Sequence, residues 1–354
     1  MDKATIEFLK DLVEAPSPSG YEQPAMDVVR DRMKQFTNNI STDVHGNVMG
    51  VVNPDAELRV MLAGHCDEIG LMVKHISDEG FIYFAPIGGI DISLLPGGRV
   101  KIHTEKGPLL GVIGKKPIHL MEPEDRKKTP KLSNLWIDIG ARNKKDAEKT
   151  VAIGDPITFD VSFETLKNNL AVSKGFDDKA GAFVVCETLR LVAKSRKKSK
   201  VAVYGVATVQ EELGLRGAQT AAFGIDPHVG IAVDVDFASD YPTINKTTVG
   251  DVALNKGPVI ARGANINPVV HKRMVATARK NKIPYQISGA PRATGTDANV
   301  IQVTRAGVAA GLVSVPNRYM HTPVELVSLK DLQNTARLLA AFILDLKPGV
   351  DFTP

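Results

Sequence analysis

The stretch VAVYGVATVQEELG, at residues 201–214, indicates the fold class. Its first part, Val201–Val209, is apolar and rich in valine, which is typical of a strand buried on both faces of a sheet. Helical patterns flank this strand at about residues 179–193 and 215–223, and a second apolar strand is expected at 229–235. Apolar strands that alternate with amphipathic helices predict a layered α/β domain with a mixed sheet.

The same kinds of element extend toward both ends of the chain. The further helices, strands and hairpin are expected at residues 6–13, 28–36, 40–52, 58–63, 268–280, 285–288, 308–313 and 328–346. We therefore expect the α/β domain to be built from two separate parts of the chain, residues 1–70 and 166–354.

The pattern changes between these two parts. From residue 71 to residue 165, short β-like runs alternate with turns that contain glycine, proline or charged residues. This sequence pattern is typical of a small all-β unit. We expect a β-barrel or sandwich inserted into the α/β domain.

Composition and charge exclude several classes of protein. The chain has 354 residues, of which 43% are hydrophobic and 24% charged, as in an ordinary globular protein. A net charge of +4 and an aromatic content of 5% give no basis for a nucleic-acid partner, and the basic run at 194–200 is interpreted as a solvated loop. No apolar run approaches the roughly 18 residues that span a bilayer. The N-terminus also lacks the apolar core of a signal peptide, so we expect no membrane partner and a cytoplasmic location.

The two cysteines restrict the kind of metal site that the chain can form. Cys66 and Cys186 lie far apart in the sequence and belong to no CxxC motif. This excludes a disulfide framework and a cysteine-based metal or redox site. Any metal site must therefore be built from histidine and carboxylate side chains.

Five short segments carry the candidate chemistry. Each places a histidine or a carboxylate just after an apolar strand or in a turn bounded by glycine. They are GHCDEIG at 64–70, KGFDDKAG at 174–181, TVQEELG at 208–214, VDVD at 233–236 and YMHTPVE at 319–325. Because the active sites of open α/β sheets lie beyond the carboxyl ends of the strands, such positions favour a function.

The first two segments each offer two acids or an imidazole with an acid. His65 precedes Asp67 by two positions, so one side chain can ligate a metal while the other orients it. Asp177 and Asp178 open a helix. They are either N-terminal caps of that helix or a carboxylate that bridges two cations.

The remaining three segments admit the same two kinds of interpretation. Glu211 and Glu212 follow a strongly apolar strand, where one can bind a metal and the other can act as a general base, unless both are solvated turn acids. Asp234 lies at the rim of the sheet and His321 in a loop, and either residue alone could be an ordinary loop residue. Together the segments supply two imidazoles and several carboxylates, a ligand set that suits Zn, Co or Mn. Two ions that share one carboxylate fit the number of ligands.

The ordered segments GHCDEIG, GFDDKAG, QEELGLRGA, AVDVD and MHTPVE resemble those of the tetrahedral (TET) and glutamyl/deblocking aminopeptidase family of di-metal peptidases. The resemblance covers essentially the whole chain. It implies a di-zinc peptidase domain that is interrupted by a β-barrel dimerisation domain, in agreement with the change of pattern at 71–165.

The resemblance also implies the metal ligands. His65 and Asp234 would serve one metal ion. Glu212 and His321 would serve the other ion. Asp177 would be the carboxylate that bridges the two.

Two further roles follow from the same resemblance. Glu211 would be the general base, and Asp67 the acid that steadies the site. Asp178 remains an alternative to Asp177 as the bridging carboxylate. The family often has threonine where this chain has Asp236. The chain therefore carries an additional acid near the site, and Asp236 is a minor alternative to Asp234 as a ligand.

These observations predict a cytoplasmic metallo-aminopeptidase that removes N-terminal residues from short peptides. Its cofactors would be two divalent metal ions, Zn or Co, which activate the attacking water. Two alternatives remain, a metal-dependent glycan hydrolase and a metal-binding scaffold without catalysis. The sequence leaves open which N-terminal residue is preferred.

The resemblance further predicts that the chain associates with itself. Dimers would form through residues 71–165 and assemble into a tetrahedral dodecamer. The stretch GGIDISLLPGG contains Ile90, Ile92, Leu94 and Leu95, which either pack against a partner subunit or fill the core of the barrel.

Overall fold

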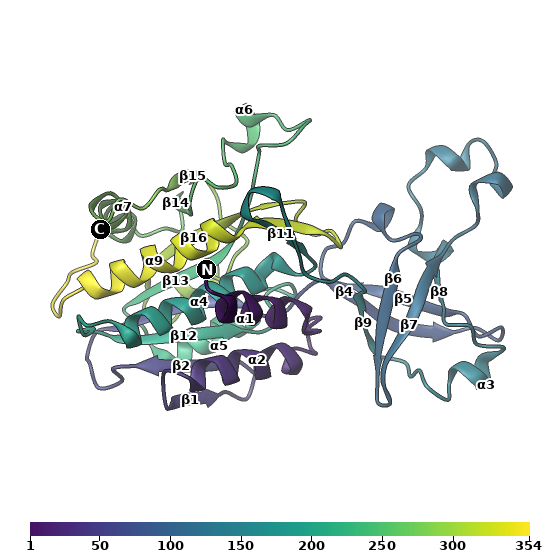
Figure 1. The fold of residues 1–354 in the computed structure, drawn as a ribbon, viewed down its shortest axis with the longest axis horizontal. Helices are drawn as coiled ribbons and strands as arrows, with labels where there is room; N and C mark the ends of the chain where they lie inside the picture. The colour runs from purple at the N-terminus through teal and green to yellow at the C-terminus, as the bar shows by residue number, and fades with distance from the viewer.

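The computed structural model describes the backbone of residues 1–354 and every side chain except that of Asp125. A large α/β lobe and a smaller β lobe lie next to each other along the longest axis of the molecule (Figure 1). The chain leaves the large lobe after strand β3 (Arg59–His65) and returns after strand β9 (Pro156–Phe159). The predicted α/β fold with an inserted β-barrel is thereby confirmed.

The large lobe is organised around one mixed sheet, to which eleven strands of the described chain contribute. In order of pairing, they are β1 (Asn39–Thr42), β2 (Val48–Val52), β12 (Ala202–Thr208), β3, β13 (Val229–Phe237), β16 (Ala309–Arg318), β17 (Glu325–Ser328), β11 (Leu170–Ser173) and β10 (Glu164–Leu166), with β14 (Val259–Gly263) and β15 (Gln286–Ala290) attached at β16. The central strands β12, β3, β13 and β16 are parallel, and their carboxyl ends therefore lie at the same edge of the sheet.

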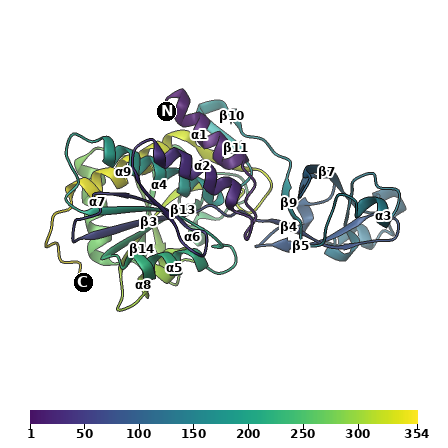
Figure 2. The ribbon, with the colours of Figure 1, turned by 90° about the horizontal axis from the view of Figure 1, so that it is seen from below.

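Helices cover both faces of this sheet. Figure 2 shows α1 (Lys3–Glu14), α2 (Gln23–Lys34), α4 (Phe176–Lys194) and α9 (Leu329–Asp345) on one side, and α5 (Arg216–Ile225) and α8 (Ala298–Gln302) on the other. Helix α7 (Pro268–Lys280) packs against α9 and β14, and α6 (Lys246–Val249) is a short exposed turn. This two-sided cover explains why the central strands are apolar on both faces.

Helix α4 lies closer to the sheet than a side chain would allow. A Cβ atom added at Gly64 would lie 2.5 Å from the carbonyl carbon of Gly181 and 2.6 Å from the amide nitrogen of Ala182. A Cβ atom at Gly181 would collide with Asp178 and with the backbone of Val233. Glycine at both positions therefore brings the first turn of α4 into contact with the ends of β3 and β13.

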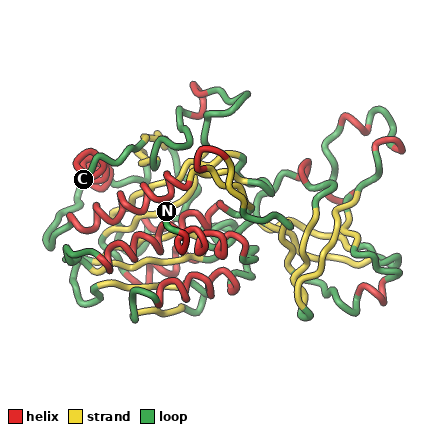
Figure 3. Tube along the Cα trace, in the orientation of Figure 1, coloured by secondary structure: helices red, strands yellow, loops and turns green.

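The small lobe is a closed barrel (Figure 3). Its strands are, in order of pairing, β4 (Gly70–Ile76), β5 (Ile82–Ile87), β8 (Trp136–Asp138), β7 (Gly107–Gly114), β6 (Arg99–Thr104) and β9. Alternate side chains point inward and form a separate apolar core that includes Leu71, Val100 and Ile137. The connections between the strands carry α3 (Lys144–Ala147) and the short 3-10 turns η1 (Ile92–Leu94), η2 (Ile118–Leu120), η3 (Asp125–Lys127) and η4 (Leu132–Asn134), while η5 (Lys167–Asn169) lies between β10 and β11.

Most of the apolar stretch at 90–95 packs into the barrel's own core, and contact with a partner subunit stays a prediction. Leu95 is buried in the barrel core, and Ile90 and Ile92 pack against that core. The side chain of Leu94 is exposed.

Among the described residues, no helix has both the length and the apolar character needed to span a bilayer. The cytoplasmic location stays a prediction.

The contact between α4 and the sheet yields a test of stability. Gly64→Ala should destabilise the fold by about 1–3 kcal/mol, because the added methyl group meets backbone that cannot move without shifting α4. Gly224→Ala is the matched control, since this glycine is exposed in α5 and a Cβ there has no neighbour within 4 Å. Alanine should leave the control unchanged or raise its stability by up to about 1 kcal/mol. The thermal unfolding midpoint measures both, and equal midpoints for the two variants would contradict the close contact.

Candidate active site

The residues predicted from the sequence gather in one cavity of about 720 Å³ at the carboxyl edge of the sheet. The predicted ligands and the predicted base all line it: His65, Asp177, Glu211, Glu212, Asp234 and His321. His65 is the last residue of β3, and the two glutamates follow the end of β12. The parallel strands thus bring together residues that are distant in sequence.

The imidazole of His65 is fixed from one side and open on the other. Its Nδ1 lies 3.0 Å from the carbonyl oxygen of Asp67, to which it can donate a hydrogen bond. The other ring nitrogen, Nε2, faces the cavity and lies 3.3 Å from Oδ1 of Asp177. Burial alone would lower the pKa of His65, but the carboxylates of Glu211 and Asp177 raise it well above its usual value.

The second imidazole approaches the same carboxylate from the opposite side. His321 lies in the loop between β16 and β17, and its Nε2 is 3.2 Å from Oδ2 of Asp177. The same nitrogen is 3.6 Å from Oε1 of Glu212. Asp177 raises the pKa of His321 to about 9. The two oxygens of Asp177 therefore each face a different imidazole.

The neighbouring acid, Asp178, has a different environment. It is fully buried, and its oxygens accept hydrogen bonds from the backbone N–H groups of Gly181 (2.9 Å) and His65 (3.2 Å). Burial and the nearby carboxylate of Asp234 raise its pKa well above the usual value. Asp178 thus ties the start of α4 to the end of β3, whereas Asp177 points between the imidazoles. The peptide bond that joins the two acids is cis.

Two groups of side chains in the described chain place their ligand atoms within 4.8 Å of one another. The first group is His65, Asp178 and Asp234, and the second is Asp177, Glu212 and His321. Asp177 belongs to the second group by this measure, yet its other oxygen lies next to His65. The two groups are therefore adjacent, with Asp177 between them.

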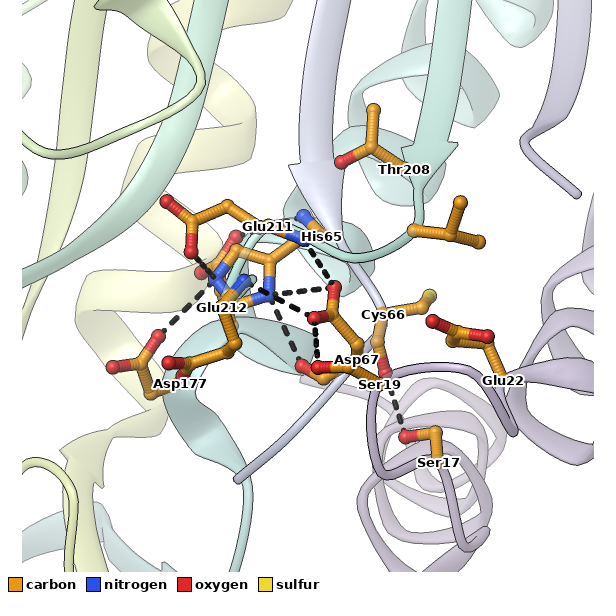
Figure 4. Close-up of polar contacts among 12 residues, drawn as sticks. Ser17, Ser19, Glu22, His65, Cys66, Asp67, Asp177, Thr208, Glu211 and Glu212 are labelled. Atoms are coloured by element: carbon orange, nitrogen blue, oxygen red, sulfur yellow. Dashed lines mark hydrogen bonds and ion pairs between the residues drawn. The ribbon is translucent and has the colours of Figure 1, made fainter. Parts of the chain in front are cut away.

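Asp67 connects the end of β3 to the two glutamates (Figure 4). Its oxygens accept hydrogen bonds from the backbone N–H groups of Glu211 (3.0 Å) and Glu212 (3.2 Å) and from the hydroxyl of Ser19 (2.7 Å). Burial alone would raise the pKa of Asp67, but the hydrogen bonds from His65 and Ser19 keep it below its usual value. Asp67 therefore acts from behind the site, by fixing the backbone that carries the glutamates.

Burial leaves the charges of the two glutamates only partly compensated. Burial, together with the charge of Asp234, raises the pKa of Glu211 to about 9. Burial and the charge of Asp177 raise the pKa of Glu212 to about 7. Oε1 of Glu212 is buried and has no hydrogen-bond partner among the described residues. A buried carboxylate oxygen without a donor is a position that a cation can fill.

The donor set fits divalent metal ions. It combines imidazole nitrogens with carboxylate oxygens and contains no thiolate from the two cysteines, which are buried and outside the two groups. No lysine or arginine is found among the described residues that line the cavity. The crowded carboxylates therefore have only the imidazoles as positive partners, and bound cations would balance their charge.

Glu325 is a supporting residue that the sequence analysis did not assign. Its oxygens accept hydrogen bonds from the backbone N–H groups of Asp177 (2.7 Å) and His321 (3.0 Å), so one buried carboxylate positions both residues. A signal was present, because Glu325 ends the segment YMHTPVE and begins β17. Ser19, which donates to Asp67, had no such signal because it comes from a distant loop.

A buried ionic cluster holds the other side of α4. Glu68 accepts hydrogen bonds from Nζ of Lys174 at 2.8 Å and lies 3.0 Å from Nζ of Lys179. Lys179 also donates to the carbonyl oxygen of Ala15 at 2.6 Å. Burial lowers the pKa of Lys179 to about 7 despite its acidic neighbour. This cluster joins the N-terminal segment, β3 and α4 directly behind the cavity.

Two further acids lie near the predicted ligands but outside both groups. Asp297 is buried and accepts a hydrogen bond from the hydroxyl of Thr208 at 2.7 Å, at the end of β12. Asp236 lines the cavity and accepts a hydrogen bond from the backbone N–H of Phe237 at 2.8 Å. Asp236, the minor alternative to Asp234, is thus not gathered with the ligand atoms.

Comparison with known proteins identifies the class. A family model described as M42 glutamyl aminopeptidase matches residues 46–338. The chain is 39% identical to a lysyl aminopeptidase of Pyrococcus furiosus over 351 residues, which cover 98% of this chain and 99% of the relative. The fold and the sequence therefore define an aminopeptidase, an enzyme that hydrolyses peptides.

Solved structures agree with this class. The structure of a TET aminopeptidase from a Thaumarchaeota archaeon superimposes with a TM-score of 0.93 at 36% identity, covering 98% of this chain and 97% of the other. The Pyrococcus horikoshii TET1 peptidase, described as assembling into a tetrahedron or a large octahedral shell, gives a TM-score of 0.86 at 33% identity, covering 97% and 100%. The chain belongs to the M42 glutamyl aminopeptidase family.

Proposed function

We propose that this aminopeptidase acts on short peptides and uses two divalent metal ions that share one carboxylate. The observation that carries the proposal is the position of Asp177, whose two oxygens lie 3.3 Å and 3.2 Å from the imidazoles of His65 and His321. Two cations placed between such partners would replace the direct contacts of imidazole with carboxylate.

The proposed ligand sets follow the two sides of Asp177. His65 and Asp234 would hold one ion. Glu212 and His321 would hold the other. Two contacts support these roles. Nδ1 of His65 lies against a backbone carbonyl, which leaves Nε2 available as a metal ligand, and Oε1 of Glu212 has no hydrogen-bond partner among the described residues.

The choice of Asp177 over Asp178 as the bridge is supported by their hydrogen bonds. Both oxygens of Asp178 already accept backbone N–H groups. Asp177 receives its backbone support through its own N–H, which donates to Glu325, so its carboxylate stays available. A bridging ligand needs both oxygens free, which favours Asp177.

Bound divalent ions would supply two effects, polarisation of the scissile carbonyl and a lower pKa for the attacking water. Glu211 would then accept the proton of that water and deliver it to the leaving amine. Its carboxylate is 3.8 Å from Nε2 of His65, beside the proposed ligands, and its backbone is held by Asp67. Positive charge in the site would lower the raised pKa of Glu211 toward the range in which it accepts protons.

The charge of the cavity also fits the free end of a peptide. Its lining carries several carboxylates and, among the described residues, no lysine or arginine. A protonated α-amino group is therefore attracted, whereas a C-terminal carboxylate is repelled. This arrangement supports removal of single residues from the N-terminus.

The metal is proposed to be Zn or Co. Imidazole together with carboxylate favours ions of intermediate softness, and these are the common catalytic ions with such ligands. The family name refers to glutamyl substrates and the Pyrococcus furiosus relative is named for lysyl substrates, so the names alone assign no side-chain preference to this chain.

Two other functions are less well supported. A glycan hydrolase would normally use two carboxylates without a metal, and the imidazoles on either side of Asp177 would then have no role. A metal-binding scaffold would need no general base, yet Glu211 points into the cavity with its backbone fixed.

The first test combines the metal and the base. We expect the wild-type enzyme to hydrolyse aminoacyl-p-nitroanilides, to lose this activity with a chelator, and to regain it with Zn or Co. Glu211→Gln should reduce kcat by at least about 10²-fold while retaining the metal, because glutamine keeps the shape but cannot take up the proton. Initial rates and metal analysis after dialysis measure both effects.

Two outcomes would contradict these assignments. Hydrolysis that continues in the presence of a chelator would exclude the metal mechanism. Loss of metal from the Glu211→Gln variant would make Glu211 a ligand and exchange its role with that of Glu212.

The second test concerns the ligands. His65→Ala and His321→Ala should each weaken one metal site more than the other, because each imidazole faces a different oxygen of Asp177. Asp177→Ala should weaken both sites. The metal content after dialysis distinguishes them. The assignment fails if Asp178→Ala removes both ions from a folded protein and Asp177→Ala removes neither.

We also propose that residues 71–165 form the dimer contact and that dimers assemble into a hollow dodecamer. The barrel lies at one end of the molecule (Figure 1), and of its described residues only Gly89, in the loop after β5, reaches the cavity. It exposes apolar side chains that include Leu94, Leu110, Val112, Ile118 and Leu120. Such side chains can contribute to the roughly 1,000 Å² that a stable interface buries. The tetrahedral assembly of the Pyrococcus horikoshii relative supports the same arrangement.

The assembly is tested by size. Gel filtration with light scattering should give a particle of about twelve subunits at neutral pH, because closed symmetric oligomers are the common form of association. Dimers are expected after chelation or at low protein concentration. A fully active monomer of 38.1 kDa would exclude the proposed assembly.

A further inference from the structure

One carboxylate in the cavity has no part in the proposed chemistry. Asp236 lies on β13 two residues after Asp234, and alternate residues of a strand point to the same face. Both side chains line the cavity, but only Asp234 belongs to a group of ligand atoms. Asp236 therefore occupies the position next to the metal centre along the wall of the substrate cavity.

Asp236 retains the capacity to bind a ligand. Its carboxylate accepts hydrogen bonds from the backbone N–H of Phe237 and from the side chain of Ser288 on β15. An ionised carboxylate has about four acceptor sites, so further sites remain. The residue is only partly buried and lines the cavity, and no lysine or arginine is among the described residues of that lining. A cation from the solvent side can reach it without displacing a protein partner.

The neighbouring lining would accommodate a long aliphatic stem. Ala261 of β14, Ala290 of β15 and Leu312 of β16 line the same cavity, and all three side chains are apolar. The two alanines are small and leave room in the cavity. A cavity with apolar lining and one acid matches a side chain that is apolar along its length and charged at its tip.

The spacing agrees with the length of such a side chain. Two residues of extended strand separate positions by about 6.6 Å. A lysine ammonium lies about 6 Å from its own Cα, since five bonds of about 1.5 Å follow a zigzag path. A substrate whose scissile carbonyl is near Asp234 can therefore place a basic group next to Asp236.

We propose that Asp236 is a specificity-determining residue that receives the cationic side chain of an N-terminal lysine or arginine. This inference rests on the proposed aminopeptidase function and adds the class of substrate. Ser288 is assigned as a positioning residue, because its side chain hydrogen-bonds to the carboxylate of Asp236. A glutamyl substrate would bring like charge to the same position and be disfavoured.

The experiment compares p-nitroanilides of lysine, arginine, leucine and glutamate on the full-length, metal-loaded enzyme. The wild type should give the highest kcat/KM with lysine or arginine, and the ratio of these two shows which basic group fits better. Asp236→Asn should lower kcat/KM for both basic substrates by at least about tenfold, because asparagine keeps hydrogen bonding but lacks the charge. The leucine value should change by less than about twofold, and glutamate should improve relative to lysine.

Two control variants separate charge from structure. Asp55→Asn removes the same charge at an exposed position that is not part of the cavity lining, and should leave every ratio unchanged. Ser288→Ala should lower the lysine value less than Asp236→Asn does. The metal content of the Asp236→Asn enzyme should equal that of the wild type.

The outcomes separate this inference from the proposed function. If the wild type cleaves leucine substrates but shows no preference for basic ones, the specificity assignment is wrong and the aminopeptidase function stands. An equal loss for all substrates in Asp236→Asn would show a structural role, and a loss of metal would show a ligand role; either result overturns the proposal. If no substrate is cleaved by the metal-loaded wild type, the proposed function itself fails and this inference with it.

Discussion

The close approach of α4 to the ends of β3 and β13 is the constraint on which the site depends. Only glycine at positions 64 and 181 permits this contact, since a Cβ at either position would meet backbone. The contact carries the first turn of α4 to the carboxyl edge of the sheet, where Asp177 reaches the imidazole of His65. A wider separation would leave the carboxylate on the helix and the imidazole on the strand as unrelated polar groups.

The same contact creates an electrostatic imbalance that explains the chemistry of the cavity. Behind α4, the charge of Glu68 is balanced by the ammonium groups of Lys174 and Lys179. In front of α4, the carboxylates of the cavity have no such partner among the described residues, and burial raises the pKa of Glu211 and of Glu212. Because an unpaired buried charge is costly, the carboxylate of Glu68 is already compensated, whereas the carboxylates of the cavity are suited to bind cations.

The sequence predicted the parts of this site that follow strand ends, and it did so for a physical reason. His65, Glu211 and Asp234 each follow an apolar run, and the carboxyl ends of parallel strands converge. The contributions of Glu325 and Ser19 could not be predicted in this way, because neither follows an apolar strand: Glu325 begins β17, and Ser19 lies in a turn between α1 and α2. The barrel was predicted from the alternation of short β-like runs and turns. Which of the neighbouring leucines 94 and 95 is exposed and which is buried depends on how the chain turns, and could not be predicted. Likewise β16 extends through Pro316, where the apolar pattern had ended, since its partner β13 continues alongside it.

Strand β13 carries both a proposed metal ligand, Asp234, and the proposed specificity residue, Asp236, at a fixed spacing. Asp234 and Asp236 lie on one face of it, so the distance between the proposed metal centre and the proposed side-chain pocket would be set by the strand repeat and not by a flexible loop. Other residues that line the same cavity come from β14, β15 and β16, which are joined to the same sheet. On this proposal, substitutions there would alter the shape and charge of the pocket without moving the proposed ligands on β3 and α4. A sheet that carries both positions at a fixed spacing would thus allow the substrate preference to change while the reacting groups keep their places.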